Sequence, residues 1–274
     1  MAILKIGTSS FSSKDWVGTF YPEKTKPADF LRYYSTKFNT VEIDSSYYAV
    51  PSETTIKRWA ENTPGDFIFS LKFPRAIVHG GKGSSPDPEL LLCKDSTYPI
   101  RDAFLKSVSH LDSRLGPLLL QFPYFSQKAF SSASPFFDKL DRFLYDLPKN
   151  YRFCVEIRNK AWLTTEFADL CRKHSAALVL VDHGWMPHGD EVMRRFDPVT
   201  TDFTYIRLLG DRKKIEEITT NWDKVVVDHT ESLNKWADLI KKLLNRDIVI
   251  YTYSNNHYAG HGPATSNTLM NMLK

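Results

Sequence analysis

Eight short apolar segments recur along this 274-residue chain, and they constrain its fold more than any other feature. Each segment is rich in β-branched and aromatic residues, and its hydrophobicity is continuous rather than alternating. Parallel strands that are covered on both faces have this pattern. The predicted strands are Ile3–Gly7, Thr40–Ile43, Phe67–Lys72, Leu118–Phe122, Phe153–Ile157, Ala177–Asp182, Phe203–Leu208 and Ile248–Tyr253.

Helical patterns follow most of these segments. Ser52 stands just before an apolar stripe at helical spacing, which makes it a natural N-cap. The predicted helices begin near Pro27, Glu53, Pro135, Thr164, Glu231 and Pro263. Between Asp182 and Asp202 the sequence shows no clear helical pattern, and we expect none there.

Eight strands with intervening helices fit either a closed barrel or an open doubly wound sheet. The count of eight favours the barrel, as does the absence of a GxGxxG turn after the first segment. Hydrophobic residues make up 42% of the chain, enough for a large core. We therefore predict an α/β fold in which residues 1–274 form a single (β/α)8 TIM-barrel domain.

Two long loops are predicted, Val78–Pro99 after the third strand and Gly210–Val227 after the seventh. Both would lie over the C-terminal face, where TIM barrels carry their active sites. Gly80–Ser85 is glycine-rich but does not match GxxxxGK[ST], so a flexible lid is a better interpretation than a phosphate loop.

Charge and cysteine content narrow the functional class only slightly. The net charge of +4 permits nucleic-acid binding without requiring it. The three cysteines are far apart and form no CxxC motif, which argues against a disulfide framework or a structural zinc site. No signal peptide and no membrane-spanning apolar stretch is visible, so we expect a cytoplasmic protein without a membrane partner.

Every predicted strand delivers a polar side chain at its C-terminal end. Residues two apart on a strand share a face, so Glu42 and Asp44 should point the same way, as should Glu156 and Arg158. At any one position an ordinary polar strand end is the alternative: Glu156 and Arg158 could be a plain ion pair, and Asp182 could cap a loop. Eight polar ends together indicate a site in the barrel mouth. These residues are Thr8 and Ser9, Glu42 and Asp44, Lys72, Gln121, Glu156 and Arg158, Asp182 and His183, Arg207, and Asn255 and Asn256.

These residue types suit acid–base chemistry on an anion. Glu156, Glu42 and Asp182 are candidates for general acid and base, and Lys72 is the fourth catalytic candidate. Arg158 and Arg207 could bind a phosphate or carboxylate with paired hydrogen bonds. The remaining candidate binding residues are the amides Gln121, Asn255 and Asn256, the hydroxyls Thr8 and Ser9, His261, and the aromatic residues Trp16, Tyr47 and Trp162. For each aromatic residue, packing is the alternative.

A divalent metal is a possible but less favoured cofactor, and the sequence indicates no other. Carboxylates and histidines are present in numbers that could assemble a site: Glu42, Glu156, Asp182, His183, His257 and His261. However, no HExxH or HxH pair occurs, and the nearby arginines would repel a cation. Nucleophilic catalysis has little support, since there is no GxSxG motif and no cysteine beside a histidine.

Five segments resemble the YecE-like family of uncharacterised (β/α)8 barrels, a domain of unknown function. They cover nearly the whole chain in order: Gly7–Ile77, LLLQFP at Leu118–Pro123, VEIRNKAW at Val155–Trp162, YIRLLG at Tyr205–Gly210, and YSNNHYAGHGPATSN at Tyr253–Asn267. The resemblance implies the barrel independently of the strand count. Two mouth positions depart from the family pattern, with Asp44 where asparagine is frequent and Leu209 where a histidine often follows Arg-Leu.

The favoured function is an enzyme of hydrolase or isomerase/lyase type that acts by acid–base chemistry on a small anionic or phosphorylated substrate. The family barrel is similar to xylose-isomerase and apurinic-endonuclease barrels, which implies a nucleic-acid-processing alternative, with or without a metal. In that case the sugar-phosphate backbone of the nucleic acid would be contacted by Lys14, Lys24, Lys26 and Arg212–Lys214. A non-catalytic ligand-binding module is the third possibility, and the oligomeric state is left open.

Three hypotheses about the site follow. The polar strand ends should converge on one mouth, and an anion should lie between Arg158 and Arg207. Glu156 should be the central acid–base group, because burial and a neighbouring guanidinium shift its pKa in opposite directions. The competing hypothesis is that Glu156 only fixes the rotamer of Arg158.

Overall fold

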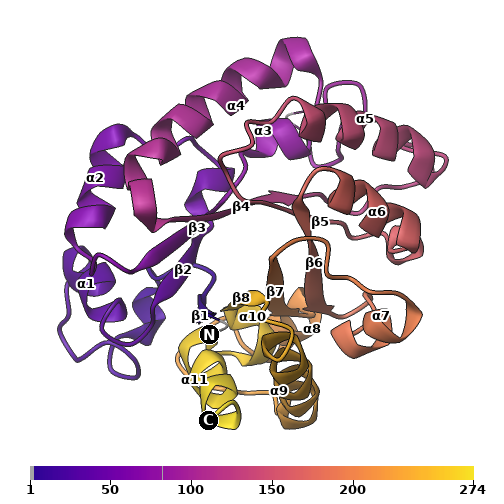
Figure 1. Cartoon of the computed structure of the whole chain (residues 1–274). Coiled ribbons are helices and arrows are strands. Elements are labelled where there is room, and N and C mark those ends of the chain that lie inside the picture. Colours follow the sequence, from indigo (N-terminus) through magenta and orange to yellow (C-terminus); the bar gives the residue numbers. More distant parts are fainter. Residues whose placement is uncertain (1–2, 82) are drawn as a thin grey trace.

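The computed structural model describes residues 3–81 and 83–274, which form the predicted (β/α)8 barrel (Figure 1). Lys82, in the predicted lid, lies outside the described residues. All neighbouring strand pairs are parallel, in the order β1-β8-β7-β6-β5-β4-β3-β2. The strands are β1 (Leu4–Thr8), β2 (Thr40–Ile43), β3 (Ile68–Lys72), β4 (Leu115–Gln121), β5 (Phe153–Glu156), β6 (Ala176–His183), β7 (Phe203–Gly210) and β8 (Val249–Ser254).

Helices surround the strand ring on the outside (Figure 1). The Ser52 hydroxyl accepts a hydrogen bond from the Thr55 amide at 3.2 Å, which confirms the predicted N-cap. The helices are α1 (Phe30–Tyr34), α2 (Glu53–Glu61), α3 (Arg75–Val78), α4 (Lys94–Val108), α5 (Ala133–Tyr145), α6 (Thr165–Lys173), α7 (Gly189–Arg195), α8 (Arg212–Ile218), α9 (Thr230–Leu244), α10 (Asn256–Ala259) and α11 (Gly262–Met272).

Three expectations about the connecting segments were wrong in part. Helix α7 lies in the interval where none was expected, and α4 and α8 begin inside the two predicted loops. Helices α7 and α4 were not predicted because each contains a residue that usually disfavours a helix, glycine in α7 and proline in α4. Gly189 opens α7 because a Cβ there would approach the Trp236 ring to 2.6 Å, and Pro99 lies inside α4 at the cost of a helical hydrogen bond.

The core has two layers. The larger fills the space between the sheet and the helices and contains most of the buried aromatic rings. The smaller lies inside the barrel, since its members alternate along the strands with the outward residues. It consists of Leu119, Cys154, Ala177, Val179, Val181, Phe203, Tyr205, Leu209, Tyr251 and Tyr253. This packed interior forms the floor of the mouth. None of the described helices is both long enough and apolar enough to cross a bilayer.

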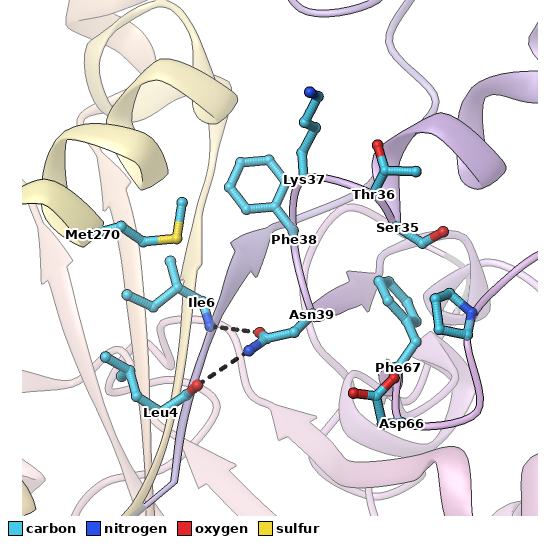
Figure 2. Close-up of a pocket in the computed structure, with 11 residues that line it drawn as sticks. Leu4, Ile6, Ser35, Thr36, Lys37, Phe38, Asn39, Asp66, Phe67 and Met270 are labelled. Carbon is cyan, nitrogen blue, oxygen red and sulfur yellow. Dashed lines mark hydrogen bonds between the residues drawn. The ribbon is translucent and has the colours of Figure 1, made fainter.

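The ring closes between β1 and β2, where the backbone pairing is reduced to one bridge, Ser9 with Glu42. Toward the other end of this seam, the Asn39 side chain replaces the missing ladder, as Figure 2 shows. Its Oδ1 accepts from the Ile6 amide and its Nδ2 donates to the Leu4 carbonyl, both at 3.3 Å. A pocket of about 400 Å³ opens beside it.

Candidate active site

A cavity of about 330 Å³ lies at the C-terminal ends of the strands. Seven of the predicted strand-end residues line it, namely Asp44, Lys72, Gln121, Arg158, His183, Arg207 and Asn255. Tyr47, also a predicted binding residue, lines it too. Polar residues from β3, β4, β5, β7 and β8 thus meet at one place, as expected for the carboxyl ends of parallel strands.

Arg207 lies at the centre of a buried network beneath this cavity, and only 1% of its surface is exposed. One terminal nitrogen donates to Glu156 Oε2 at 2.7 Å and to Gln121 Oε1 at 2.8 Å. The other donates to Glu42 Oε1 at 2.7 Å. Both carboxylates are fully buried, and they raise the pKa of Arg207 well above its usual value even though burial opposes this.

Glu42 is held from three further directions. Its Oε1 accepts from the Ser9 hydroxyl at 2.8 Å, and its Oε2 accepts from the Tyr205 hydroxyl at 2.7 Å. The ammonium group of Lys72 lies 3.8 Å from Oε1. No oxygen of Glu42 is therefore left without a donor.

Glu156 joins Arg207 to Arg158. Its second oxygen, Oε1, accepts from Arg158 Nε at 2.5 Å. Burial disfavours the charged form of Glu156, but the guanidinium groups of Arg158 and Arg207 outweigh it and lower the pKa to about 2. A carboxylate held this firmly in its ionised form is a poor proton acceptor near neutral pH. This geometry favours the hypothesis that Glu156 positions Arg158.

Lys72 and Asp44 form a second charged pair in the mouth, with Lys72 Nζ 2.5 Å from Asp44 Oδ1. Burial alone would raise the pKa of Asp44, but Lys72 and Arg207 lower it overall. The mouth thus holds three carboxylates, Glu42, Asp44 and Glu156, against three cations, Lys72, Arg158 and Arg207.

The cavity is also lined by Asp44, His183, Arg212 and His257, which were not among the predicted catalytic and substrate-binding residues. The sequence indicated Asp44 only as a strand end, His183 as a strand end and possible metal ligand, His257 as a possible metal ligand, and Arg212 as a possible nucleic-acid contact. His183 is notable because its Nδ1 is buried and has no partner among the described residues. Burial first, and then the charge of Arg158, lowers its pKa to about 4, so its imidazole is neutral at neutral pH.

Asp182 does not face the mouth, contrary to the prediction. It lies on the outer face of β6, where its Oδ2 accepts from Ser232 Oγ at 2.5 Å, Trp236 Nε1 at 2.8 Å and the Tyr258 hydroxyl at 2.9 Å. Successive strand residues point to opposite faces, so His183 turns inward where Asp182 turns outward.

Four predicted binding residues serve as supports behind the mouth. The Asn256 side-chain oxygen accepts from Trp16 Nε1 at 3.1 Å and from the Gly262 amide at 2.9 Å. His261 Nδ1 caps α11 by accepting from the Ala264 amide at 3.2 Å. The Thr8 hydroxyl donates to the Ser10 carbonyl at 2.6 Å.

Trp162 is also absent from the cavity lining. Its ring stacks with Phe125 and Phe136, with ring centroids 5.9 and 5.6 Å apart. Packing, the alternative considered for each aromatic residue, therefore accounts for Trp162.

No metal site is apparent in the described part of the chain. Among residues 3–81 and 83–274, no three His, Cys, Asp or Glu side chains are grouped so that they could hold an ion. The carboxylates of the mouth bind Arg207, Arg158 and Lys72 instead.

Comparison with known proteins supports the same fold over its full length. A crystal structure of a DUF72 family protein from Thermotoga maritima superposes with a TM-score of 0.73, at 28% identity and with 99% of each chain covered. A DUF72 family protein from Enterococcus faecalis, at 19% identity, superposes with a TM-score of 0.69 over 100% of this chain and 98% of its own. At that identity the likeness shows the fold alone.

Two curated relatives match over part of the chain. UPF0759 protein YunF of Bacillus subtilis is 28% identical over 177 residues, covering 60% of this chain and 54% of YunF. UPF0759 protein YecE of Escherichia coli K12 is 32% identical over 130 residues, covering 47% of this chain and 41% of YecE. The chain thus spans about half the length of the curated relatives it matches.

The family model described as "Protein of unknown function DUF72" matches residues 5–274. This confirms the YecE-like resemblance read from the sequence motifs. The chain belongs to the DUF72 family.

Proposed function

We propose that the barrel mouth binds a small anionic, phosphorylated ligand and acts on it by acid–base chemistry. The observation that carries this proposal is an imbalance between donors and acceptors. Both oxygens of Glu42 and of Glu156 are occupied, as are the side-chain oxygens of Gln121, by Arg207, and of Asn255, by the His257 amide and ring.

Several hydrogen-bond donors of the mouth, in contrast, have no acceptor among the described residues. Arg158 uses only its Nε, so its terminal nitrogens have no described acceptor, and neither do the amide nitrogens of Gln121 and Asn255. Lys72 Nζ adds further N–H groups. Asp44 also lines the cavity, with Oδ1 against Lys72 and Oδ2 without a donor among the described residues. Although the formal charges balance, a ligand entering this cavity therefore meets more N–H groups than acceptors. Phosphate, which offers only acceptor oxygens when fully ionised, complements such a surface.

This arrangement moves the expected anion position. Arg207 has its terminal nitrogens on two carboxylates and an amide, so the earlier hypothesis of an anion between Arg158 and Arg207 is modified to one between Arg158 and Lys72. Arg158 is pre-oriented by Glu156, and Lys72 by Asp44. Pre-oriented donors bind an anion without a further ordering cost.

His183 is the best candidate for the proton-transferring group, in place of Glu156. It is neutral at neutral pH, its ring lines the cavity, and Nδ1 has no partner within the described residues. An anion bound beside it would raise its pKa toward neutrality, which is the range in which histidine transfers protons well. Lys72 would stabilise negative charge that develops on the substrate.

The binding part of the proposal is tested by titration calorimetry with inorganic phosphate and ribose 5-phosphate. Arg158→Ala should weaken binding by about 1.5–3 kcal/mol, the range of a charge-assisted hydrogen bond. Arg194→Ala is the matched control, because Arg194 is 67% exposed on α7, pairs with Asp190 and does not line the mouth. Absence of binding by both probes, or equal affinities for wild type and Arg158→Ala, would refute an anion site.

The catalytic part is tested by incubating the protein with a panel of phosphorylated compounds and following them by phosphorus NMR. Once a substrate is found, His183→Asn should lower turnover by roughly 10²–10⁴ and leave phosphate affinity nearly unchanged. Tight phosphate binding with no product from any compound would instead support the non-catalytic ligand-binding module.

A further inference from the structure

Two large aromatic side chains stand exposed on opposite sides of the mouth. Tyr48, in the loop after β2, is 81% exposed, and Trp185, in the loop after β6, is 49% exposed. Three strands separate β2 from β6 in either direction around the ring, and Figure 1 shows them facing one another across it. Ligand pockets are commonly lined by aromatic side chains together with a few polar groups.

Trp185 is exposed but held in place. Its indole N–H donates to the carbonyl of Arg158 at 3.1 Å, and its ring meets the His183 ring with centroids 4.1 Å apart. Both of these partners line the cavity. The indole is thus fixed beside the anion donors and does not have to be ordered when a ligand binds.

Tyr48 occupies the other side. It lines the cavity itself, and its ring lies edge to face with that of Tyr47 at 5.3 Å. Among the described residues its hydroxyl has no side-chain or backbone partner at hydrogen-bond distance, so it is free to bond a ligand or water.

The cavity is small, so a ligand larger than a phosphate group would extend out of it to the exposed rings of Tyr48 and Trp185. A volume of about 330 Å³ is at the low end for ligand pockets. A phosphate group bound between Arg158 and Lys72 would use part of it, and the rest of the ligand would extend toward Tyr48 and Trp185.

The scarcity of acceptors disfavours a bare sugar in that outer position. Each sugar hydroxyl needs an acceptor for its proton. The oxygens of Glu42, Glu156, Gln121 and Asn255 are already occupied, and the carboxylate of Asp44, which lines the cavity, is paired with Lys72. A flat aromatic ring needs none, because it is held by stacking on other rings.

We propose that the ligand of this mouth is a phosphate ester that carries a flat aromatic ring, of the nucleoside monophosphate type, with the ring between Tyr48 and Trp185. This inference rests on the proposed function, because it places the phosphate at Arg158 and Lys72. It goes further by assigning the two rim residues to ring recognition.

The test compares four probes by calorimetry: inorganic phosphate, ribose 5-phosphate, uridine and uridine 5′-monophosphate. The monophosphate should bind at least about tenfold more tightly than ribose 5-phosphate, since stacking a base contributes on this order. Tyr48→Ala should remove most of that advantage without changing the affinity for inorganic phosphate. Tyr48→Phe, which keeps the ring, should retain it.

Tyr145→Ala serves as the control, because Tyr145 is 72% exposed at the end of α5 and does not line the mouth. Equal affinities for ribose 5-phosphate and uridine 5′-monophosphate, with both weakened by Arg158→Ala, would overturn the ring assignment and leave the proposed function intact. Failure of every phosphate probe to bind would refute both the ring assignment and the proposed function. Loss of the advantage in Tyr48→Phe as well as in Tyr48→Ala would also overturn the ring assignment, because the hydroxyl would then be responsible.

Discussion

Glu156 acts in this protein as a buried anion held between two guanidinium groups. Each of its oxygens accepts from a different arginine, and neither is exposed to water. Removing one partner of a buried ion pair leaves the other charge without compensation, which typically costs about 3–5 kcal/mol. The residue is therefore important to stability as well as to the orientation of Arg158.

We expect Glu156→Gln to lower the free energy of unfolding by about 3–5 kcal/mol at pH 7. Gln keeps the size of the side chain and one acceptor, but it cannot neutralise Arg158 and Arg207. Urea unfolding followed by circular dichroism measures the change. Glu231→Gln is the control, because Glu231 is 87% exposed and should shift stability by less than about 0.5 kcal/mol. A Glu156→Gln protein as stable as wild type would mean that the network relaxes without it.

The acid dependence of stability provides a second prediction at this residue. Because the pKa of Glu156 is lowered from 4.5 to about 2 in the folded protein, its stabilising contribution is complete above pH 4.5. The contribution is lost as pH falls from 4.5 toward 2. The difference in unfolding free energy between wild type and Glu156→Gln should therefore shrink across this range. A difference that stays constant down to pH 3 would contradict the lowered pKa.

At the residue scale, the sequence revealed which residue types meet in the mouth but not which faces they occupy. Lys72, Gln121, Arg158 and Arg207 could be found because each lies within three residues of the C-terminal end of a recognisable strand. The choice of Asp182 over its neighbour His183 failed because β6 is apolar on both faces, so its hydrophobic pattern does not distinguish inside from outside. Pairing with β7 is also irregular at this point, which no local pattern encodes.

At the element scale, Asp182 joins β6 to the helices that cover it. Three donors, from Ser232 and Trp236 on α9 and Tyr258 on α10, converge on one of its oxygens. Hydrogen bonds to a charged acceptor are stronger than neutral ones, so this carboxylate holds α9 and α10 against the barrel.

Asp182→Ala should destabilise the protein by about 3 kcal/mol or more, since three donors lose their acceptor. It should leave the affinity for inorganic phosphate unchanged, because the side chain faces away from the mouth. Urea unfolding and calorimetry together test this. Asp238→Ala is the control: Asp238 is exposed on α9, the helix that carries Ser232 and Trp236, and its loss should change neither stability nor phosphate affinity. A large loss of phosphate affinity in a folded Asp182→Ala protein would return Asp182 to the active site.

Strands were easier to predict than helices in this chain. The observed strand limits differ from the expected ones by three residues or fewer. Helix α7 was missed because its first residue is Gly189, which reads as a helix breaker but is required by the approach of Trp236. That requirement arises from a contact with α9, so it is a tertiary effect that a local pattern cannot show.

At the scale of the whole molecule, the seam between β1 and β2 is the weakest join in the ring. Here the Asn39 side chain hydrogen-bonds the backbone of β1 and replaces the backbone pairing that joins the other strands (Figure 2). A Cβ at Gly7 would lie 2.0 Å from the Thr40 carbonyl oxygen, so the two strands also approach too closely for any other residue at this position.

Asn39→Ala should accelerate hydrogen exchange of the Ile6 amide and lower the unfolding free energy by about 1 kcal/mol, since the side chain is exposed and two hydrogen bonds are lost. Native-state exchange measured by NMR reports the first effect, and urea unfolding the second. Asn271→Ala, an exposed change on α11, is the control. Unchanged exchange at Ile6 would show that the seam is closed by other contacts.

The dependence of β1 on β8 also sets an order of assembly. Strands β2 to β7 each pair with strands that neighbour them in the sequence, so they can associate as the chain is synthesised. β1 pairs over five residue positions with β8, which lies near the other end of the described chain, and it has only one bridge to β2. Closing so long a loop is slow. β8 itself pairs over six residue positions with its sequence neighbour β7. In pulse-labelled refolding, the amides that join β1 to β8 should therefore gain protection last, and until then the edges of β2 and β8 remain open to pairing with other chains.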